Sequence, residues 1–328
     1  MVLRFFRSSF FSQYLAICLA GLLLWGRGFF YPAHLPLPEG PVPLYRLLYN
    51  VLAGIPVTAT ILGFIVSLIS AFLANYLLVH NEIVNKNSSL TGFLFIIFTG
   101  FHPALLILNP VSIVLLLLLL TVNSLFDSYN KTESQDLIYL AGFLIGTGSF
   151  IYFPFLAFYG FILVALILFR SSNWREWLSS LLGLLTPYLF LSAYYFWFDE
   201  LLFKWNIFVH SFAIYLKPGF IMDPGFVIQA GVIVLVMIAG WLNSVVHLSE
   251  KTIEIRKKAI LLNWLVLFVI LSLIFGNNLQ TLHFLLIAGC TAFLMAMYLL
   301  QLKRSFWQEI VLILVFVAFV VGNFLTAG

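Results

Sequence analysis

Glu39 is the acidic side chain best placed to do chemistry in this chain, because it lies in a short segment stiffened by proline. Residues 31–43 contain five prolines, and the same segment carries His34. A rigid loop over a membrane surface can hold a carboxylate in one position, as catalysis requires. Arg27 precedes the segment, and its guanidinium either snorkels to the interface, binds a lipid phosphate or pairs with Glu39. Glu39 is therefore the candidate catalytic carboxylate.

A second group of polar side chains follows a helical spacing after residue 198. At about 100° per residue, one face of a helix collects four polar side chains, and the opposite face is apolar and aromatic. The polar set is Asp199, Asn206, His210 and Lys217. The apolar set is Leu201, Trp205, Phe208, Val209, Phe212 and Leu216. Such a helix lies flat at a membrane surface, where its polar stripe either covers the interface or contacts a substrate.

Two histidines, His102 and His283, fall near the ends of apolar runs, beside Pro103 and Asn277-Asn278. A histidine in such a place is either a hydrogen-bonded interfacial residue or an assisting base. The chain has no nucleotide-binding loop, no metal-ligand spacing and no nucleophile turn. All its acidic residues lie in or beside predicted loops, so the sequence does not indicate ion or proton transport, which usually leaves charge in mid-span.

Composition indicates an all-α polytopic membrane protein. Of the 328 residues, 63% are hydrophobic and 9% are charged, and the mean hydropathy is +1.09. A soluble globule needs more polar surface than this. The net charge of +4 is spread over short loops rather than gathered in a patch, which argues against nucleic-acid binding. Cys18 and Cys290 have no redox or metal spacing, and we interpret both as small residues buried in lipid.

Apolar runs of about 20 residues, the length of a spanning helix, predict a bundle of eleven spans. These are residues 13–30, 46–78, 90–108, 110–126, 137–153, 154–169, 178–198, 225–242, 259–275, 281–300 and 310–325. The second run is too long for one crossing, so we expect a short interfacial helix over 43–50 and a bend at Gly54-Ile55-Pro56. Gly142 and Gly146 predict close helix packing, and Glu254 and Lys258 lie four apart on one helix face.

The basic residues predict the orientation. A cytoplasmic amino terminus places twelve of the sixteen Lys and Arg residues inside, as the positive-inside rule requires. The remaining four are Arg27, Arg46, Lys204 and Lys217. The carboxyl terminus is then extracytoplasmic, and the segments around Glu39 and Asp199 lie on the outer face.

The chain resembles the membrane glycosyltransferases of the C superfamily. The likeness rests on the long loop after the first span, the amphipathic segment after the seventh, and residues 137–154, LIYLAGFLIGTGSFIYFP. It implies a seven-helix module over residues 1–225, with four further spans over 226–328. Residues 169–177, FRSSNWREW, are also similar to segments of uncharacterised bacterial multi-pass proteins. The expected location is the bacterial plasma (inner) membrane.

The first resemblance implies a reaction and a set of residue roles. Such enzymes transfer a sugar from a polyprenyl-phosphate carrier on the extracytoplasmic side and use an acidic residue of the first external loop. Glu39 would accept a proton or help to hold a divalent metal, with Asp199 and Glu200 as a second acidic cluster. Arg27, Arg46 or Lys204 would hold the carrier phosphate. His283 or His102 would assist catalysis.

A non-enzymatic function is the competing expectation. An assembly or scaffolding subunit, or a small-molecule permease without buried charge, accounts equally for the sparse polar side chains. Convergence of Glu39, Arg27, the acids after residue 198 and a histidine on one outer cavity would favour transfer. Closely packed spans with unrelated polar groups would favour the scaffold.

Overall fold

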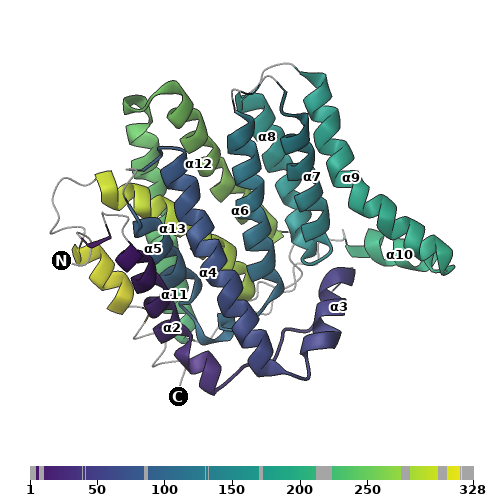
Figure 1. Ribbon diagram of the computed structural model, residues 1–328, viewed down its shortest axis with the longest axis horizontal. Coiled ribbons are helices and arrows are strands. Elements are labelled where there is room, and N and C mark those ends of the chain that lie inside the picture. The colour runs from purple at the N-terminus through teal and green to yellow at the C-terminus, as the bar shows by residue number, and fades with distance from the viewer. Residues whose placement is uncertain are drawn as a thin grey trace.

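The protein is an all-helical bundle over the residues that the computed structural model describes (Figure 1). These are residues 5–6, 11–38, 40, 42–84, 88–129, 131, 133–169, 173–211, 224–274, 281–301, 309–317 and 319. They contain α- and 3-10 helices and no strand. Glu39, Lys217 and the last predicted span beyond residue 319 lie outside the described residues.

Long α-helices form the body of the bundle, and short 3-10 helices join some of them. The α-helices are α2 (Phe11–Phe30), α3 (Pro43–Leu52), α4 (Pro56–His80), α5 (Leu90–Thr99), α6 (Pro110–Ser128), α7 (Gln135–Ser149), α8 (Tyr159–Phe169), α9 (Trp174–Trp197), α10 (Leu201–Ser211), α11 (Pro224–Val246), α12 (Ile253–Ile274) and α13 (Phe284–Gln301). The 3-10 helices are η1 (Pro103–Leu105), η2 (Phe153–Phe158), η3 (His247–Glu250) and η4 (Thr281–His283).

Six helices of the described chain are long and apolar enough to cross a membrane. They are Phe11–Phe30, Pro56–His80, Pro110–Ser128, Trp174–Trp197, Gly225–Glu250 and Phe284–Gln301. The protein is therefore a multi-pass membrane protein, and the count of eleven spans stays a prediction. The expected break before the second span is present, because α3 ends at Leu52 and α4 begins at Pro56.

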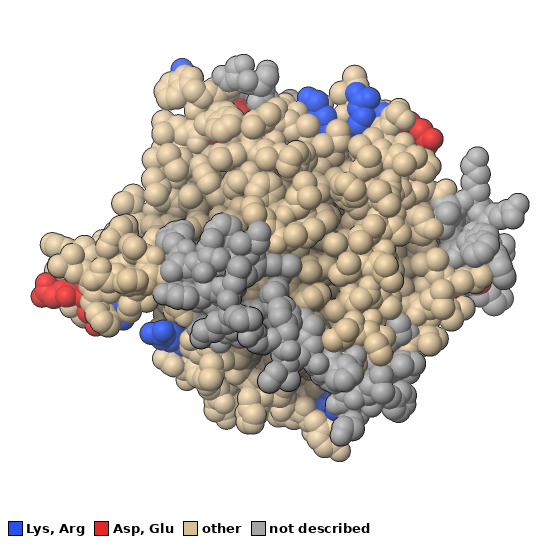
Figure 2. Space-filling model, turned by 180° about the vertical axis from the view of Figure 1, so that it is seen from behind, with Lys and Arg blue, Asp and Glu red and all other residues tan. Residues whose placement is uncertain are grey.

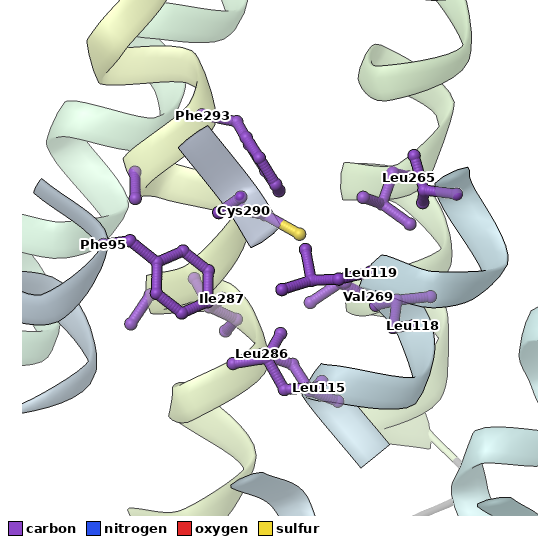
Figure 3. Packing of buried hydrophobic residues seen from close by; sticks show 14 of the residues in the cluster. Phe95, Leu115, Leu118, Leu119, Leu265, Val269, Leu286, Ile287, Cys290 and Phe293 are labelled. Carbon is purple, nitrogen blue, oxygen red and sulfur yellow. The ribbon is translucent and has the colours of Figure 1, made fainter. Parts of the chain in front are cut away.

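The core lies where α5, α6, α12 and α13 meet, as Figure 3 shows. Labelled core residues are Phe95, Leu115, Leu118, Leu119, Leu265, Val269, Leu286, Ile287, Cys290 and Phe293. The interpretation of Cys290 as a lipid-facing residue is wrong, since its side chain is buried among these residues. Helix α13 crosses the centre of the protein, and its neighbours shield it from lipid.

The third predicted span, 90–108, is not one helix. Helix α5 ends at Thr99, and the chain continues through η1 to Asn109 in an irregular path. Glycines in α2 and α4 let this path lie against them: a Cβ on Gly28 would lie 2.9 Å from the Leu106 carbonyl oxygen, and one on Gly63 would lie 2.5 Å from the Leu108 nitrogen. The Leu108 amide donates to the Ala59 carbonyl at 3.2 Å.

The fifth and sixth predicted spans also differ from the structure. Helix α7 ends at Ser149 rather than at residue 153, and the segment that follows begins as the 3-10 helix η2 before α8 starts at Tyr159. Phe155 of η2 packs where a Cβ on Gly148 would stand. The turn is therefore longer and more buried than a tight Phe-Pro connection.

The expected glycine packing joins α7 to α9. A Cβ on Gly142 would collide with the carbonyl oxygen of Ser180, and one on Gly183 would collide with that of Tyr139. A Cβ on Gly146 would lie 2.6 Å from the Leu184 carbonyl oxygen. The two backbones touch along this seam, as small residues at a helix interface permit.

Charged residues gather at the two ends of the bundle. Figure 2 shows basic side chains along the top edge, a red patch at the tip of the arm on the left, and a wide uncharged middle. The described basic residues in or beside the connections at the top end are Lys131, Arg175, Lys251, Arg256, Lys257 and Lys258. Arg27, Arg46 and Lys204 belong to α2, α3 and α10 at the opposite end. The assignment of the top end to the cytoplasm stays a prediction.

Candidate functional site

Helix α3 lies at the end of the bundle where α9 turns into α10 (Figure 1). Its first turn is anchored to the end of α7, because the Leu44 amide donates to the Phe150 carbonyl at 3.2 Å. The Tyr45 hydroxyl donates to the Pro36 carbonyl at 2.8 Å, which ties the proline segment to the helix. Burial raises the pKa of Tyr45, and the neighbouring Tyr49 raises it further, so the hydroxyl keeps its proton.

Asp199 forms the turn between α9 and α10. Its φ of 56° lies in the left-handed region, its amide donates to the Phe196 carbonyl at 3.2 Å, and the Glu200 amide donates to the Tyr195 carbonyl at 2.9 Å. This pair of bonds is the Schellman motif that ends many helices. The expectation that Asp199 shares a helix face with Asn206 is wrong, since Asp199 precedes α10. The left-handed conformation of Asp199 forms the turn between α9 and α10.

Three helices and the turn between α9 and α10 contribute four side chains to a polar rim at this end, which we call the rim cluster: Arg46, Tyr195, Glu200 and Lys204. Lys204 pairs with Glu200 at 3.4 Å, and its Nζ lies 5.6 Å from the centre of the Tyr195 ring. Glu200 and Arg46 both lie within electrostatic reach of the Tyr195 hydroxyl. Tyr195 was not predicted, because nothing separates it in sequence from its aromatic neighbours.

An aromatic floor lies beside the rim cluster and fastens α10 to the bundle. The Phe208 ring packs edge-on against Phe153 and Tyr188, with both centroid distances 5.7 Å. Tyr188 also packs on Phe150 at 4.8 Å and shares a 2.6 Å hydrogen bond with Ser149.

The apolar side chains of α10 are not confined to the predicted face. Trp205 of that face is exposed and Phe208 packs on the bundle, and Leu202 and Phe203, which lie outside it, are exposed as well. His210 is exposed in the last turn of the same helix. An exposed aromatic surface of this kind suits the interface of a bilayer.

The two histidines contact other groups than the rim cluster. The Tyr152 hydroxyl and the His283 Nε2 share a hydrogen bond, and Tyr152 is next in sequence to Phe153 of the floor. His102 accepts a 3.2 Å hydrogen bond from the Ala104 amide on Nδ1, which caps η1. Its ring packs edge-on against Phe226 at 5.4 Å. Both histidines are buried.

The structure gives fewer contacts for the remaining predicted residues. Arg27 is exposed in the last turn of α2, and His34 is exposed in the proline segment. Glu39 lies outside the described residues, so its distance from Arg27 and from the rim cluster stays a prediction. Within the described part of the chain, no group of three or more His, Cys, Asp or Glu side chains could hold a metal ion.

Sequence comparison gives a family but no activity. Residues 43–327 match the Family of unknown function (DUF6427), a region that includes α3, the arm of α9 and α10, and all later helices. No curated protein and no solved structure is significantly similar to the chain. The resemblance to membrane glycosyltransferases therefore gains no support from these comparisons. Because the match covers most of the sequence, the chain belongs to the Family of unknown function (DUF6427).

Proposed function

We propose that the protein binds the phosphate of a membrane lipid at its outer end and acts there as a lipid-linked sugar transferase in the bacterial plasma membrane. The observation that supports the proposal is the rim cluster, where Lys204 of α10 lies over the Tyr195 ring and Arg46 of α3 lies within electrostatic reach of the Tyr195 hydroxyl. Two cations on separate helices can hold one phosphate by charge-assisted hydrogen bonds.

The surroundings of the rim cluster suit a polyprenyl-phosphate carrier. Phe190, Tyr194 and Trp197 of α9 are exposed beside it, and an isoprenoid tail could lie along them. Lys204 is already paired with Glu200, but an exposed ion pair of this type is weak. The carrier phosphate, which has one negative charge as the sugar-loaded diester and up to two as the free monoester, can therefore compete with Glu200 for the ammonium group.

The phosphate site leads to a binding prediction. Arg46→Gln is expected to weaken the binding of added undecaprenyl phosphate about tenfold, because one charge-assisted bond contributes about 1.5–3 kcal/mol. Native mass spectrometry of the detergent-solubilised protein measures the bound lipid. Arg175→Gln is the matched control, since Arg175 is an exposed arginine at the opposite end. Equal binding by the two variants would reject the rim cluster as the phosphate site.

Transfer itself depends on Glu39 in this proposal, as general base or as a ligand of a divalent metal. Glu39→Gln is expected to abolish sugar transfer from a polyprenyl-phosphate sugar while the protein stays inserted and stable. Membrane vesicles and a radiolabelled carrier sugar provide the assay, and phosphate binding by the same variant provides the control. Unchanged transfer would remove Glu39 from the mechanism.

A non-catalytic scaffold is the second candidate, because several polar side chains at this end also have structural roles. Asp199 forms the α9–α10 turn, Glu200 pairs with Lys204, and His102 caps η1. The closely packed α7–α9 seam suits a rigid framework as well as it suits an enzyme. Full cellular function of Glu39→Gln together with normal lipid binding would favour this alternative.

A further inference from the structure

Three interruptions of the helical backbone meet at the end of the bundle that carries α3. They are the irregular path around η1, the turn that leads into η2, and η4 at the start of α13. Helix η1 packs against η4, and the bond between Tyr152 and His283 joins η4 to the start of η2. Irregular backbone is tolerated inside a membrane protein where it is buried in protein or lines a binding site.

A polar aromatic side chain stands at each interruption. His102 is the residue before η1, Tyr152 is the residue before η2, and His283 is the last residue of η4. Phe226 of α11 contacts the rings of both His102 and Phe284, with centroids 5.4 and 5.0 Å apart. Phe226 therefore connects His102 to Phe284, the residue that follows His283.

The imidazole of His283 uses only one of its two nitrogens. Its side chain is 5% exposed, Nε2 is hydrogen-bonded to Tyr152, and Nδ1 is buried without a hydrogen-bond partner. An unpaired buried nitrogen destabilises the fold, and such groups in native proteins take part in a reaction or bind a water, an ion or a ligand. Tyr152 is only partly buried, so the pair reaches the surface through the tyrosine.

We propose that Nδ1 of His283 binds a hydroxyl group of a sugar or polyol at the junction of η1, η2 and η4. A hydroxyl both donates and accepts, so it complements Nδ1 in either tautomer of the ring. Burial among aromatic rings disfavours an imidazolium ion, so a hydroxyl is a better match than a phosphate. Tyr152 acts as the positioning residue that fixes the ring. The inference adds a sugar-binding position to the proposed function but does not rest on it, because such binding requires neither Arg46 nor a transfer step.

Two substitutions separate the two nitrogens of His283. The amide of Gln reaches the position of Nε2, so His283→Gln keeps the bond to Tyr152 and loses the group at Nδ1. The amide of Asn reaches the position of Nδ1, so His283→Asn keeps that group and loses the bond to Tyr152. A purely structural role predicts that Gln is the better replacement, whereas ligand binding at Nδ1 predicts that Asn is.

The experiment is a titration of the full chain in nanodiscs, labelled with [15N]histidine. Octyl glucoside below its micellar concentration is the lipid-like probe, glucose is the soluble probe, and octyltrimethylammonium is the control amphiphile without a hydroxyl. The Nδ1 resonance of His283, assigned by its loss in His283→Gln, is expected to shift saturably with a sugar probe. Loss of one hydrogen bond in His283→Gln should weaken the apparent Kd about tenfold, and His283→Asn should bind more tightly than Gln.

Each outcome has one meaning. A shift with octyl glucoside alone identifies a lipid-linked sugar, and a shift with glucose identifies a soluble one. No shift with either sugar, an equal shift with octyltrimethylammonium, or unchanged binding by His283→Gln overturns the proposal. If one variant fails to fold, loss of the Nδ1 resonance in the other assigns it, and the titration of the wild-type chain still decides the matter. Arg46→Gln should leave this titration unchanged. Failure of the hydroxyl-binding proposal and failure of the phosphate-site proposal are therefore separate results.

Discussion

Gly183→Ala is expected to destabilise the protein by about 3 kcal/mol, because the added methyl would overpack the closest contact between two helices. The collision is with the Tyr139 carbonyl oxygen, and the Phe143 nitrogen lies 3.0 Å from the same Cβ position. Backbone atoms on both sides leave no flexible side chain that could move aside. The midpoint of thermal unfolding in detergent measures the effect.

Gly231→Ala is the matched control in another helix. A Cβ at Gly231 of α11 would meet nothing within 4 Å, and alanine is favoured over glycine in a helix by up to about 1 kcal/mol. We expect this variant to unfold at the wild-type temperature or above it. If Gly183→Ala and Gly231→Ala unfold at the same temperature, the seam between α7 and α9 is not as close as described.

Lys258→Met should cost about 2 kcal/mol, since it removes a buried ammonium that joins three helices. Its Nζ donates to Asn81 Oδ1 at 2.8 Å and to Glu254 Oε1 at 2.6 Å. It also lies 5.6 Å from the centre of the Tyr129 ring, just after α6. Asn81 caps the carboxyl end of α4, where a cation interacts favourably with the helix dipole. Methionine fills a similar volume but leaves the buried Asn81 oxygen without this donor.

The neighbouring Lys257→Met provides the comparison. Lys257 lies over the same Tyr129 ring at 5.7 Å, and a cation–π contact of this kind contributes about 1 kcal/mol or less. We therefore expect a clear difference in unfolding midpoint between the two variants at equal change of charge. Equal midpoints would mean that burial of Lys258 adds no stability beyond its charge.

Contacts between residues close in sequence could be predicted, because helical spacing alone fixes them. The Glu254–Lys258 pair was expected from its separation of four and is present at 2.6 Å. Gly142 and Gly146 were expected to permit close packing and do so. The helix against which these glycines pack, α9, was not predictable, because its Gly183 is a single glycine in an ordinary apolar run.

The break after α5 could not be predicted from hydrophobicity. Residues 90–108 are mostly apolar, and a largely apolar run looks the same whether it is helical or not. Gly100 and Pro103 were the available signals, and proline near a helix end predicts a stop. The irregular path is stable only because Gly28 and Gly63, far away in sequence, make room for it.

The candidate site combines predicted and unpredicted residues. The sequence predicts Arg46 and Lys204 as phosphate ligands, and the fold places Lys204 over the Tyr195 ring and Arg46 within electrostatic reach of its hydroxyl. Asp199 was interpreted as part of a polar stripe, because its left-handed backbone is a property of the turn rather than of local spacing. The Tyr152–His283 bond joins residues 131 positions apart, which no local pattern could reveal.

The short helix α5 constrains how the chain enters its membrane. Ten helical residues rise about 15 Å, half of the hydrocarbon thickness. The remaining backbone up to Asn109 would expose unpaired amides to lipid if this segment were inserted by itself. Helices α2 and α4 must therefore already be in place to receive it, so biogenesis of the amino-terminal third is an ordered assembly in which the earlier helices shelter the later one.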